Sequence, residues 1–184
     1  MNKSCGVLAL SSALALGATQ VQALSLAASA GSNSFGLEAT QTLVPGVRAG
    51  VGYLKTDDSG RDARLYSGSL MISLPTPLVD LSVGGRYQYQ DTDYGNGGGL
   101  GLGGSLFVDT PLPRVSLGGY GFYTPEGLTH GNVNESYEYG AQVRAKLFAQ
   151  SYAYAGYRYL RTDFDRRGNR TLHSGPVLGV SVGF

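Results

Sequence analysis

Several segments of the chain alternate between apolar and polar residues, and their charged side chains fall on the polar face. Arg86 lies in the alternating segment 79–90, and Glu138 and Arg144 share one face of segment 136–148. Because successive side chains of a β-strand point to opposite faces, each charge belongs to the polar face of an extended segment. A face that carries both signs predicts ion pairing. By this parity the set is Glu38, Arg48, Asp80, Arg86, Asp109, Arg114, Glu138, Arg144, Lys146 and Arg158.

Two groups of residues have the types needed for hydrolysis. His130, Glu135 and Ser136 lie close together in the sequence, and a Ser-His-acid set activates a serine nucleophile. Nothing in their spacing fixes a geometry. His173 and Ser174 are adjacent in an alternating segment, so their side chains point to opposite faces and cannot form a dyad. We expect no enzymatic activity and no catalytic residues.

Acidic and basic clusters lie in the polar connections. Asp57, Asp58 and Asp62, or Asp91 and Asp93, could bind calcium, but EF-hand spacing is absent and solvated acids are favoured. We expect no metal and no cofactor. Arginine forks suit phosphate groups, although Asp163 and Asp165 also favour a mixed-charge loop. The arginines concerned are Arg61, Arg64, Arg161, Arg166, Arg167 and Arg170.

Composition limits the class of protein. The chain has 184 residues, enough for one domain, with 29 glycines, 13 tyrosines and no tryptophan. Its 14 basic and 13 acidic residues exclude a strongly electrostatic nucleic-acid binder. A mean hydropathy of −0.08 excludes a polytopic helical membrane protein, but not a membrane β-barrel, whose inward faces are polar.

The N-terminal segment has the layout of a secretory signal peptide. Lys3 precedes a short apolar run at 6–18, and small residues end at Ala23. We therefore predict a cleaved signal peptide at 1–23 and a single domain at 24–184. Cys5 lies before the cut, so the mature chain has no cysteine, which excludes disulfides, zinc-thiolate sites and cysteine nucleophiles.

The mature chain alternates with a period of two, and its segments are about as long as a membrane-crossing β-strand. The C-terminal segment places Leu172, Ser174, Pro176, Leu178 and Val180 on one face. Short connections at 44–46, 75–78, 110–113 and 149–151 alternate with longer polar ones at 56–63, 91–99, 124–135 and 162–171. The predicted strands are 24–30, 35–43, 47–55, 64–74, 79–90, 100–109, 114–123, 136–148, 152–161 and 172–184.

These features predict an all-β protein: a closed antiparallel up-and-down transmembrane β-barrel of the bacterial outer membrane. Short periplasmic turns, longer outer loops and an even strand number give ten strands, or eight if 24–43 stays outside the sheet. Tyrosines near the loop ends suit an aromatic girdle: Tyr87, Tyr89, Tyr137, Tyr139, Tyr157 and Tyr159. Gly179, Val182 and Phe184 have the pattern of a C-terminal signal for the barrel assembly machinery.

The charged face then points into the barrel lumen. One interpretation is a salt-bridge network that plugs a narrow barrel. The other is a narrow pore, because ten strands give slightly more room than the eight that side chains fill. Inward glycines would thin the filling or allow close packing around large side chains, and they are Gly50, Gly52, Gly84, Gly101, Gly103, Gly140 and Gly156.

The C-terminal third resembles a known family, the YfaZ-type outer membrane proteins. The resemblance lies in Gly156-Tyr157-Arg158-Tyr159-Leu160, Gly168-Asn169-Arg170, Gly175 to Val180 and the terminal phenylalanine. Leu24-Ser25-Leu26 at the start of the mature chain is also similar, whereas the absence of tryptophan departs from the family. The resemblance implies a small outer-membrane barrel and carries no catalytic residues over.

We therefore expect an integral outer-membrane barrel with a structural or envelope-interaction role and a charged, mostly plugged lumen. A narrow porin-like diffusion channel is the alternative, and a surface lipid or peptide hydrolase ranks last. The expected partners are outer-membrane lipids, lipopolysaccharide at the arginine clusters, and the assembly machinery during biogenesis. We expect a monomer that binds no nucleic acid.

Overall fold

The computed structural model describes residues 23–58, 61–76, 79–165 and 168–184, so the predicted signal peptide lies almost entirely outside the described residues. Ten long strands make up nearly all of this part of the chain. Among the described residues there is no helix long and apolar enough to cross a membrane. The strands are β1 Leu24–Gly31, β2 Ser34–Val44, β3 Val47–Asp58, β4 Arg61–Pro75, β5 Val79–Thr92, β6 Gly95–Asp109, β7 Val115–Thr124, β9 Val133–Lys146, β10 Tyr152–Phe164 and β11 Gly168–Gly183.

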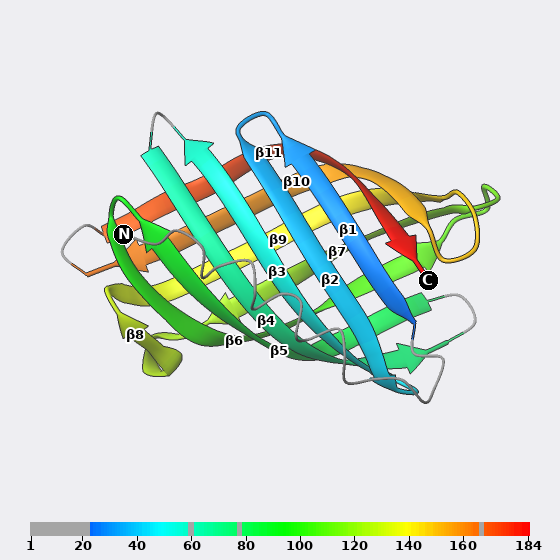
Figure 1. Ribbon diagram of the computed structural model, residues 1–184, viewed down its shortest axis with the longest axis horizontal. Helices are drawn as coiled ribbons and strands as arrows, with labels where there is room; N and C mark the ends of the chain where they lie inside the picture. Colours follow the sequence, from blue (N-terminus) through cyan, green and yellow to red (C-terminus); the bar gives the residue numbers. More distant parts are fainter. Residues whose placement is uncertain (1–22, 59–60, 77–78, 166–167) are drawn as a thin grey trace, which may run out of the picture.

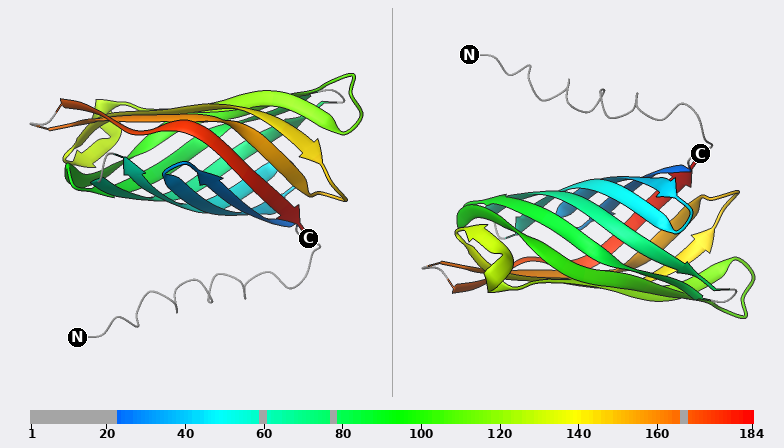
Figure 2. Two further views of the ribbon diagram at one scale, coloured as in Figure 1. Left: turned by 90° about the horizontal axis from the view of Figure 1, so that it is seen from above. Right: turned by 90° about the horizontal axis from the view of Figure 1, so that it is seen from below.

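The ten long strands close into one antiparallel barrel (Figures 1 and 2). Each pairs with its neighbours in the sequence, and β1 pairs with β11 from Ser25↔Gly183 to Gly31↔Val177. Leu24 and Phe184 extend this ladder through two backbone hydrogen bonds of 3.3 and 2.8 Å. Because β1 and β2 are part of the sheet, the ten-strand count is confirmed and the eight-strand alternative is wrong.

The chain termini of the barrel, the turns at 45–46, 110–114 and 147–151, the end of β4 and the start of β5 lie at one end. The end of β3, the start of β4, the β5–β6 turn, the end of β10 and the start of β11 lie toward the other end (Figure 1). Short turns face the periplasm in bacterial outer-membrane barrels, so we assign the first end to the periplasm and call the second the outer end.

The outward face of the barrel is apolar over its whole circumference. Leu70, Ile72, Leu102 and Leu178 are all more than half exposed, and exposed valines, leucines and tyrosines recur on every long strand. A soluble protein rarely exposes so large an apolar surface. A barrel in a bilayer needs it, because this face contacts lipid.

The strands run further toward the outer end than the hydrophobic pattern predicts. Asp57 pairs with Asp62, Asp91 with Asn96 and Asp163 with Asn169, so three of the four predicted long loops are mostly paired strand. Beyond the lipid, alternation is no longer required although the backbone ladder continues. The fourth loop contains a 3₁₀ turn, η1 Glu126–Leu128, and β8 Thr129–Gly131, which pairs with β6 beyond the end of β7.

The predicted parity of β11 is wrong at Leu172. The pairing with β10 passes from Leu160↔His173 to Arg161↔Thr171, which leaves Leu172 as the extra residue of a β-bulge. Leu172 and His173 are therefore both buried, whereas Ser174 and Leu178 are exposed as predicted. A bulge shifts the phase of alternation by one residue, and the sequence pattern contains no sign of it.

The β1–β2 hairpin is shorter than its neighbours. Gly31 pairs with Val177, so residues 168–176 of β11 continue past the end of β1. Above the hairpin, β3 meets β11 directly: Thr56 Oγ1 donates to the carbonyl oxygen of Leu172 at 2.5 Å. Pro176, which has no N–H to contribute to a ladder, is the first residue of β11 beyond the pairing with β1.

Candidate functional site

The inside of the barrel is the place where the predicted charges converge, and its two halves differ. In the outer half, inward side chains of β3, β4, β9, β10 and β11 form an apolar layer. Leu160 is 0 % and Phe164 1 % exposed, and the ring of Tyr94 lies 5.9 Å from that of Phe164. This outer apolar layer consists of Leu54, Ala63, Leu65, Val133, Leu160, Phe164 and Leu172.

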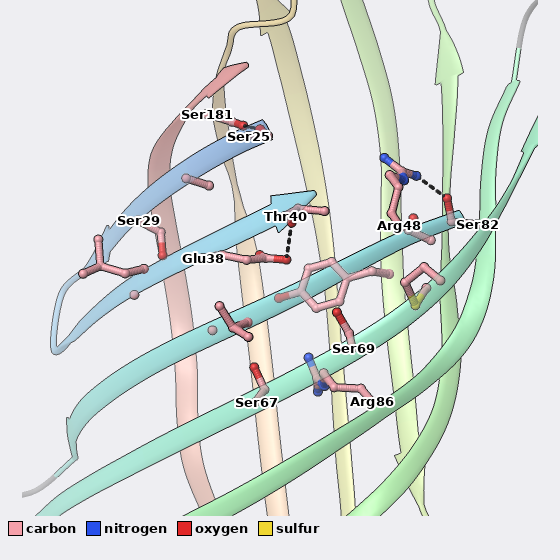
Figure 3. A pocket seen from close by; sticks show the side chains of 18 of the residues that line it. Ser25, Ser29, Glu38, Thr40, Arg48, Ser67, Ser69, Ser82, Arg86 and Ser181 are labelled. Atoms are coloured by element: carbon pink, nitrogen blue, oxygen red, sulfur yellow. Dashed lines mark hydrogen bonds between the residues drawn. The ribbon is translucent and has the colours of Figure 1, made fainter. Parts of the chain in front are cut away.

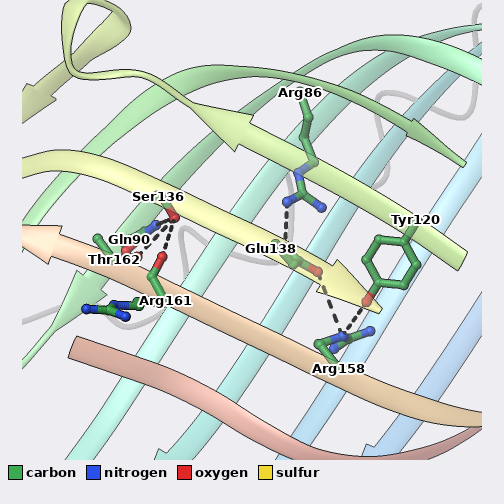
Figure 4. Close-up of polar contacts among 8 residues, drawn as sticks. All are labelled: Arg86, Gln90, Tyr120, Ser136, Glu138, Arg158, Arg161 and Thr162. Carbon is green, nitrogen blue, oxygen red and sulfur yellow. Dashed lines mark hydrogen bonds and ion pairs between the residues drawn. The ribbon is translucent and has the colours of Figure 1, made fainter. Parts of the chain in front are cut away.

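Sequence reasoning missed this layer. The signal was present, because Leu54, Leu65 and Leu160 stand at inward parity near the outer ends of their strands. A buried polar group accompanies them: Gln90 Nε2 donates to Ser136 Oγ at 3.3 Å, and the hydroxyls of Ser136 and Thr162 are 3.0 Å apart (Figure 4).

A central ion cluster lies below this layer. Arg86 Nη2 is 2.5 Å from Glu138 Oε2, and Arg158 Nε is 3.8 Å from Glu138 Oε1 (Figure 4). Arg158 Nε also donates to the hydroxyl of Tyr120 at 2.9 Å. Buried charges are stable only when they are paired and hydrogen-bonded. The prediction that Arg86, Glu138 and Arg158 face inward together agrees with this placement, whereas Tyr120 was missed.

Two further arginines lie nearer the periplasm. Arg48 Nη2 donates to Ser82 Oγ at 2.5 Å and lies 3.7 Å from Asp80 Oδ1. The guanidinium of Arg144 lies 3.3 Å from the ring centroid of Phe107, and Nε donates to Gln142 Oε1 at 3.4 Å. None of the ion pairs within the described part of the chain includes Arg144.

A cavity of about 500 Å³ lies inside the barrel (Figure 3). Its lining extends from Leu54 and Leu65 of the outer apolar layer, past the central ion cluster, to the periplasmic strand ends. Strands β1, β2, β4 and β11 present most of the serines and threonines to it, whereas the arginines come from β3, β5, β9 and β10. Ala23 and Gln150 at the periplasmic strand ends also line it. The small hydroxyl residues on its wall are Ser25, Ser29, Ser67, Ser69, Ser82, Ser105 and Ser181, with Thr40 and Thr42.

Three of the remaining predicted lumen residues lie outside this cavity. Asp109 and Lys146 are exposed at the periplasmic ends of β6 and β9. Arg114 is exposed in the β6–β7 turn with a φ of 67°, so its predicted inward placement is wrong. Glu38 does line the cavity, and its Oε1 accepts a hydrogen bond from Thr40 at 3.4 Å.

Inward glycines on the charged side of the lumen allow close packing. A Cβ added to Gly140 would lie 2.7 Å from Tyr120 Cε1, and one added to Gly103 would lie 2.7 Å from Phe122 Cδ1. The guanidinium of Arg86 lies 4.1 Å from the Phe122 ring centroid. On this side the glycines make room for aromatic rings and arginines.

The residue types that suggested a hydrolase do not assemble. His130 Nε2 lies 2.7 Å from the hydroxyl of Tyr87, whereas Ser136 is buried inside the barrel. Glu135 instead accepts hydrogen bonds from Tyr123, at 2.6 Å, and from Tyr137. Within the described residues, no group of three His, Cys, Asp or Glu side chains could hold a metal ion.

The six predicted girdle tyrosines lie on β5, β9 and β10, and several form aromatic pairs on the outer face. The rings of Tyr139 and Tyr159 stack with centroids 5.0 Å apart, and Tyr123 and Tyr137 do the same. A surface groove of about 400 Å³ lies along this face, lined by Glu135, Tyr137, Tyr139, Tyr159, Arg161 and Asn169.

The arginines predicted to contact lipopolysaccharide are dispersed. Arg161 Nε donates to Asn169 Oδ1 at 3.1 Å beside the groove, and Arg170 lies 5.4 Å from the ring centroid of Tyr94. Arg64 is exposed on β4. Arg166 and Arg167 lie outside the described residues, as does the side chain of Arg61.

At the C-terminus, Phe184 is exposed and Val182 pairs with Leu26. Gly179 has no room for a side chain, since an added Cβ would lie 2.3 Å from Tyr154 Cζ.

A closed antiparallel barrel with an apolar outer face and a charged interior defines an integral outer-membrane β-barrel protein. The family model described as YfaZ precursor matches residues 3–184, and the chain therefore belongs to the YfaZ family. It is 29% identical over 173 residues to Outer membrane protein YfaZ of Escherichia coli (strain K12), which covers 89% of this chain and 90% of that protein. The predicted family and the predicted outer-membrane location are confirmed.

Two solved structures have a similar fold. Neisserial surface protein A is 17% identical with a TM-score of 0.42, and the match covers 89% of this chain and 94% of that one. A bacterial polysaccharide outer membrane secretin is 13% identical with a TM-score of 0.46. That match covers 85% of this chain and 57% of the secretin chain.

Proposed function

We propose that this protein is a closed barrel that serves the envelope as a structural and lipid-contacting element. The observation that carries the proposal is the outer apolar layer. Leu54, Leu65, Leu160, Phe164 and Leu172 pack across the outer half of the bore, where a hydrated ion would have to lose its water among leucine and phenylalanine side chains.

Conductance tests the proposal. The refolded mature protein, shown to be folded by its heat-shifted gel mobility, is placed in a planar bilayer across several salts. We expect no steady conductance step. We expect steps when Leu54, Leu65 and Leu160 are all replaced by glycine, and none when the lipid-facing residues Leu70, Leu102 and Leu178 are replaced in the same way.

A narrow diffusion channel is the second candidate, and the polar cavity in the periplasmic half favours it. It requires a water path through the outer apolar layer. A steady step in the unmodified protein that changes with Arg86→Ala or Arg144→Ala would support the channel and overturn the closed barrel.

We further propose that the groove beside Tyr139 and Tyr159 contacts lipopolysaccharide, with Arg161 donating to a lipid phosphate. An arginine above stacked tyrosines matches a phosphate at the lipid surface. Lipopolysaccharide should raise the thermal midpoint of the barrel, and Arg161→Gln should reduce this shift. Lys146→Gln, at the exposed periplasmic end of β9, is the control, and an unchanged shift in Arg161→Gln would contradict the contact.

We also propose that the barrel is a monomer. We propose separately that the assembly machinery recognises its C-terminal residues. Phe184 lies at the end of the closing strand with its side chain exposed. Phe184→Ser should lower the amount of folded barrel in outer membranes, and refolding of the same variant in detergent should be unaffected.

A further inference from the structure

We propose that the periplasmic cavity is a binding site for a small polyhydroxylated anion, that is, a sugar-sized molecule with one carboxylate or phosphate group. The proposal goes beyond the envelope role and concerns binding, not conduction. It rests on the space inside the barrel, the charges and the hydroxyl groups that line it, and the side from which it is reached.

The cavity has the size of a small-molecule site. Its volume of about 500 Å³ falls within the range of about 300–1,000 Å³ typical of ligand pockets. The space is maintained on the β2–β4 wall by glycines facing serines. A Cβ added to Gly50 would lie 2.8 Å from Ser69 Oγ, and one added to Gly52 would lie 2.6 Å from Ser67 Oγ.

The charges on the wall leave a positive excess. Four arginines and three carboxylates line the cavity: Arg48, Arg86, Arg144 and Arg158 with Glu38, Asp80 and Glu138. Glu138 already serves Arg86 and Arg158, and Asp80 lies beside Arg48. Arg144 is the arginine of this set that takes part in no ion pair with a described residue.

Arg144 is also held ready for an anion. Its guanidinium lies over the Phe107 ring at 3.3 Å, and its Nε donates to Gln142. Stacking occupies the face of the guanidinium plane and leaves N–H groups on the edge, which can donate to two oxygens of one carboxylate or phosphate.

The serines on β1, β4 and β11 suit a polyol. Ser25, Ser29, Ser67, Ser69 and Ser181 all project into the cavity from β1, β4 and β11 (Figure 3). Each hydroxyl can both donate and accept a hydrogen bond, as the hydroxyls of a sugar do. A molecule with an anionic end and several hydroxyls would span from Arg144 to these serines.

The ligand would arrive from the periplasm. Ala23, Gln150 and Ser181 at the periplasmic strand ends line the cavity, whereas the outer apolar layer closes the other side.

Isothermal titration of the refolded mature barrel in detergent tests the site, with glucuronate, glucose 6-phosphate, glucose and glucosamine as probes. We expect at least one of the two anions to bind, and glucose and glucosamine to bind at least tenfold more weakly. Binding of glucuronate alone identifies a sugar acid, and binding of glucose 6-phosphate alone identifies a phosphate ester.

Variants locate the binding. Arg144→Gln should weaken anion binding at least tenfold, and Arg144→Lys should weaken it less because the charge remains. Ser67→Leu fills the cavity from the β4 side and should also abolish binding. Lys55→Gln, at an exposed position near the outer end of β3, should leave it unchanged. Heat-shifted gel mobility establishes that each variant is folded.

The proposal is overturned if neither anion binds, if glucose binds as well as the anions, or if folded Arg144→Gln binds like the unmodified protein. These outcomes are independent of conductance. If the barrel conducts ions and also binds anions at Arg144, only the closed-barrel function is overturned. If the barrel does not conduct and binds neither anion, only the binding site is overturned.

Discussion

The two halves of the barrel interior are built from the same alternating strands, but one half is packed with apolar side chains and the other half contains a polar cavity. In the outer half, Leu160 and Phe164 are almost completely buried, as in the core of a soluble protein. In the periplasmic half, serines and arginines surround a cavity of about 500 Å³. A fully buried leucine or phenylalanine contributes about 1.5–3 kcal/mol relative to an exposed one, whereas a hollow polar wall contributes little. We infer that the outer half stabilises the barrel and the periplasmic half is available for binding.

The largest expected loss of stability comes from the central ion cluster, which lies at the boundary between the two halves. Glu138→Gln would leave Arg86 and Arg158 buried without their carboxylate. Removing one partner of a buried ion pair costs about 3–5 kcal/mol. Denaturant unfolding followed by tyrosine fluorescence measures this loss.

Glu38→Gln is the matched control, because Glu38 forms no ion pair with a described residue. Equal, small losses in both variants would mean that the central ion cluster does not hold the boundary.

The outer half itself is tested by Leu160→Ala. Truncation of a completely buried leucine should lower the free energy of unfolding by about 2–5 kcal/mol, because the transfer term is lost and a cavity remains. Leu178→Ala, at a lipid-facing position of β11, is the control in the same denaturant experiment and should lose less. A larger loss of stability in Leu178→Ala than in Leu160→Ala would contradict the assignment of the outer apolar layer as the stabilising core.

In the periplasmic half, loss of the Arg144 charge should lower the free energy of unfolding only slightly. Arg144→Gln removes a cation–π contact with Phe107 that is worth about 0.5–2 kcal/mol. We expect a loss of stability of this size in the denaturant curve, while the anion affinity falls at least tenfold. A loss as large as that of Glu138→Gln would place Arg144 among the structural charges.

The smallest effect is expected for Arg48→Gln. The side chains of Arg48 and Asp80 are 37% and 54% exposed, and their charged atoms are 3.7 Å apart. Exposed pairs contribute about 0–1 kcal/mol. The thermal midpoint at low and high salt should therefore be nearly that of the unmodified protein, and a shift of many degrees would contradict a solvated periplasmic half.

Much of this architecture could be predicted from the sequence because a barrel in lipid imposes strict alternation. That rule gave the ten strands, the outward tyrosines and the inward Arg86, Glu138 and Arg158. It failed at Leu172, where a bulge shifts the phase, and beyond the lipid, where Asp57 and Asp62 still pair.

The division of the interior could not be predicted. Whether Arg86 meets Glu138, 52 residues away, depends on the register and stagger of strands around the whole barrel. The inward leucines were visible in the sequence, but their convergence into one layer requires the same register. Arg144 could be placed inside by parity, but not beside Phe107.

The short β1–β2 hairpin has a consequence for how the barrel folds. The ladder between β1 and β11 joins the first and last strands of the barrel, and the hydroxyls of Ser25 and Ser181 lie 2.9 Å apart across a separation of 156 residues. Every other pair of adjacent long strands is close in the sequence, so its hydrogen bonds can form progressively from the connecting segment. Closure of so long a loop has the highest entropic cost in the molecule, and it is met by one of the shortest ladders. The edges of β1 and β11 should therefore be the last to pair during folding and the first to separate during unfolding.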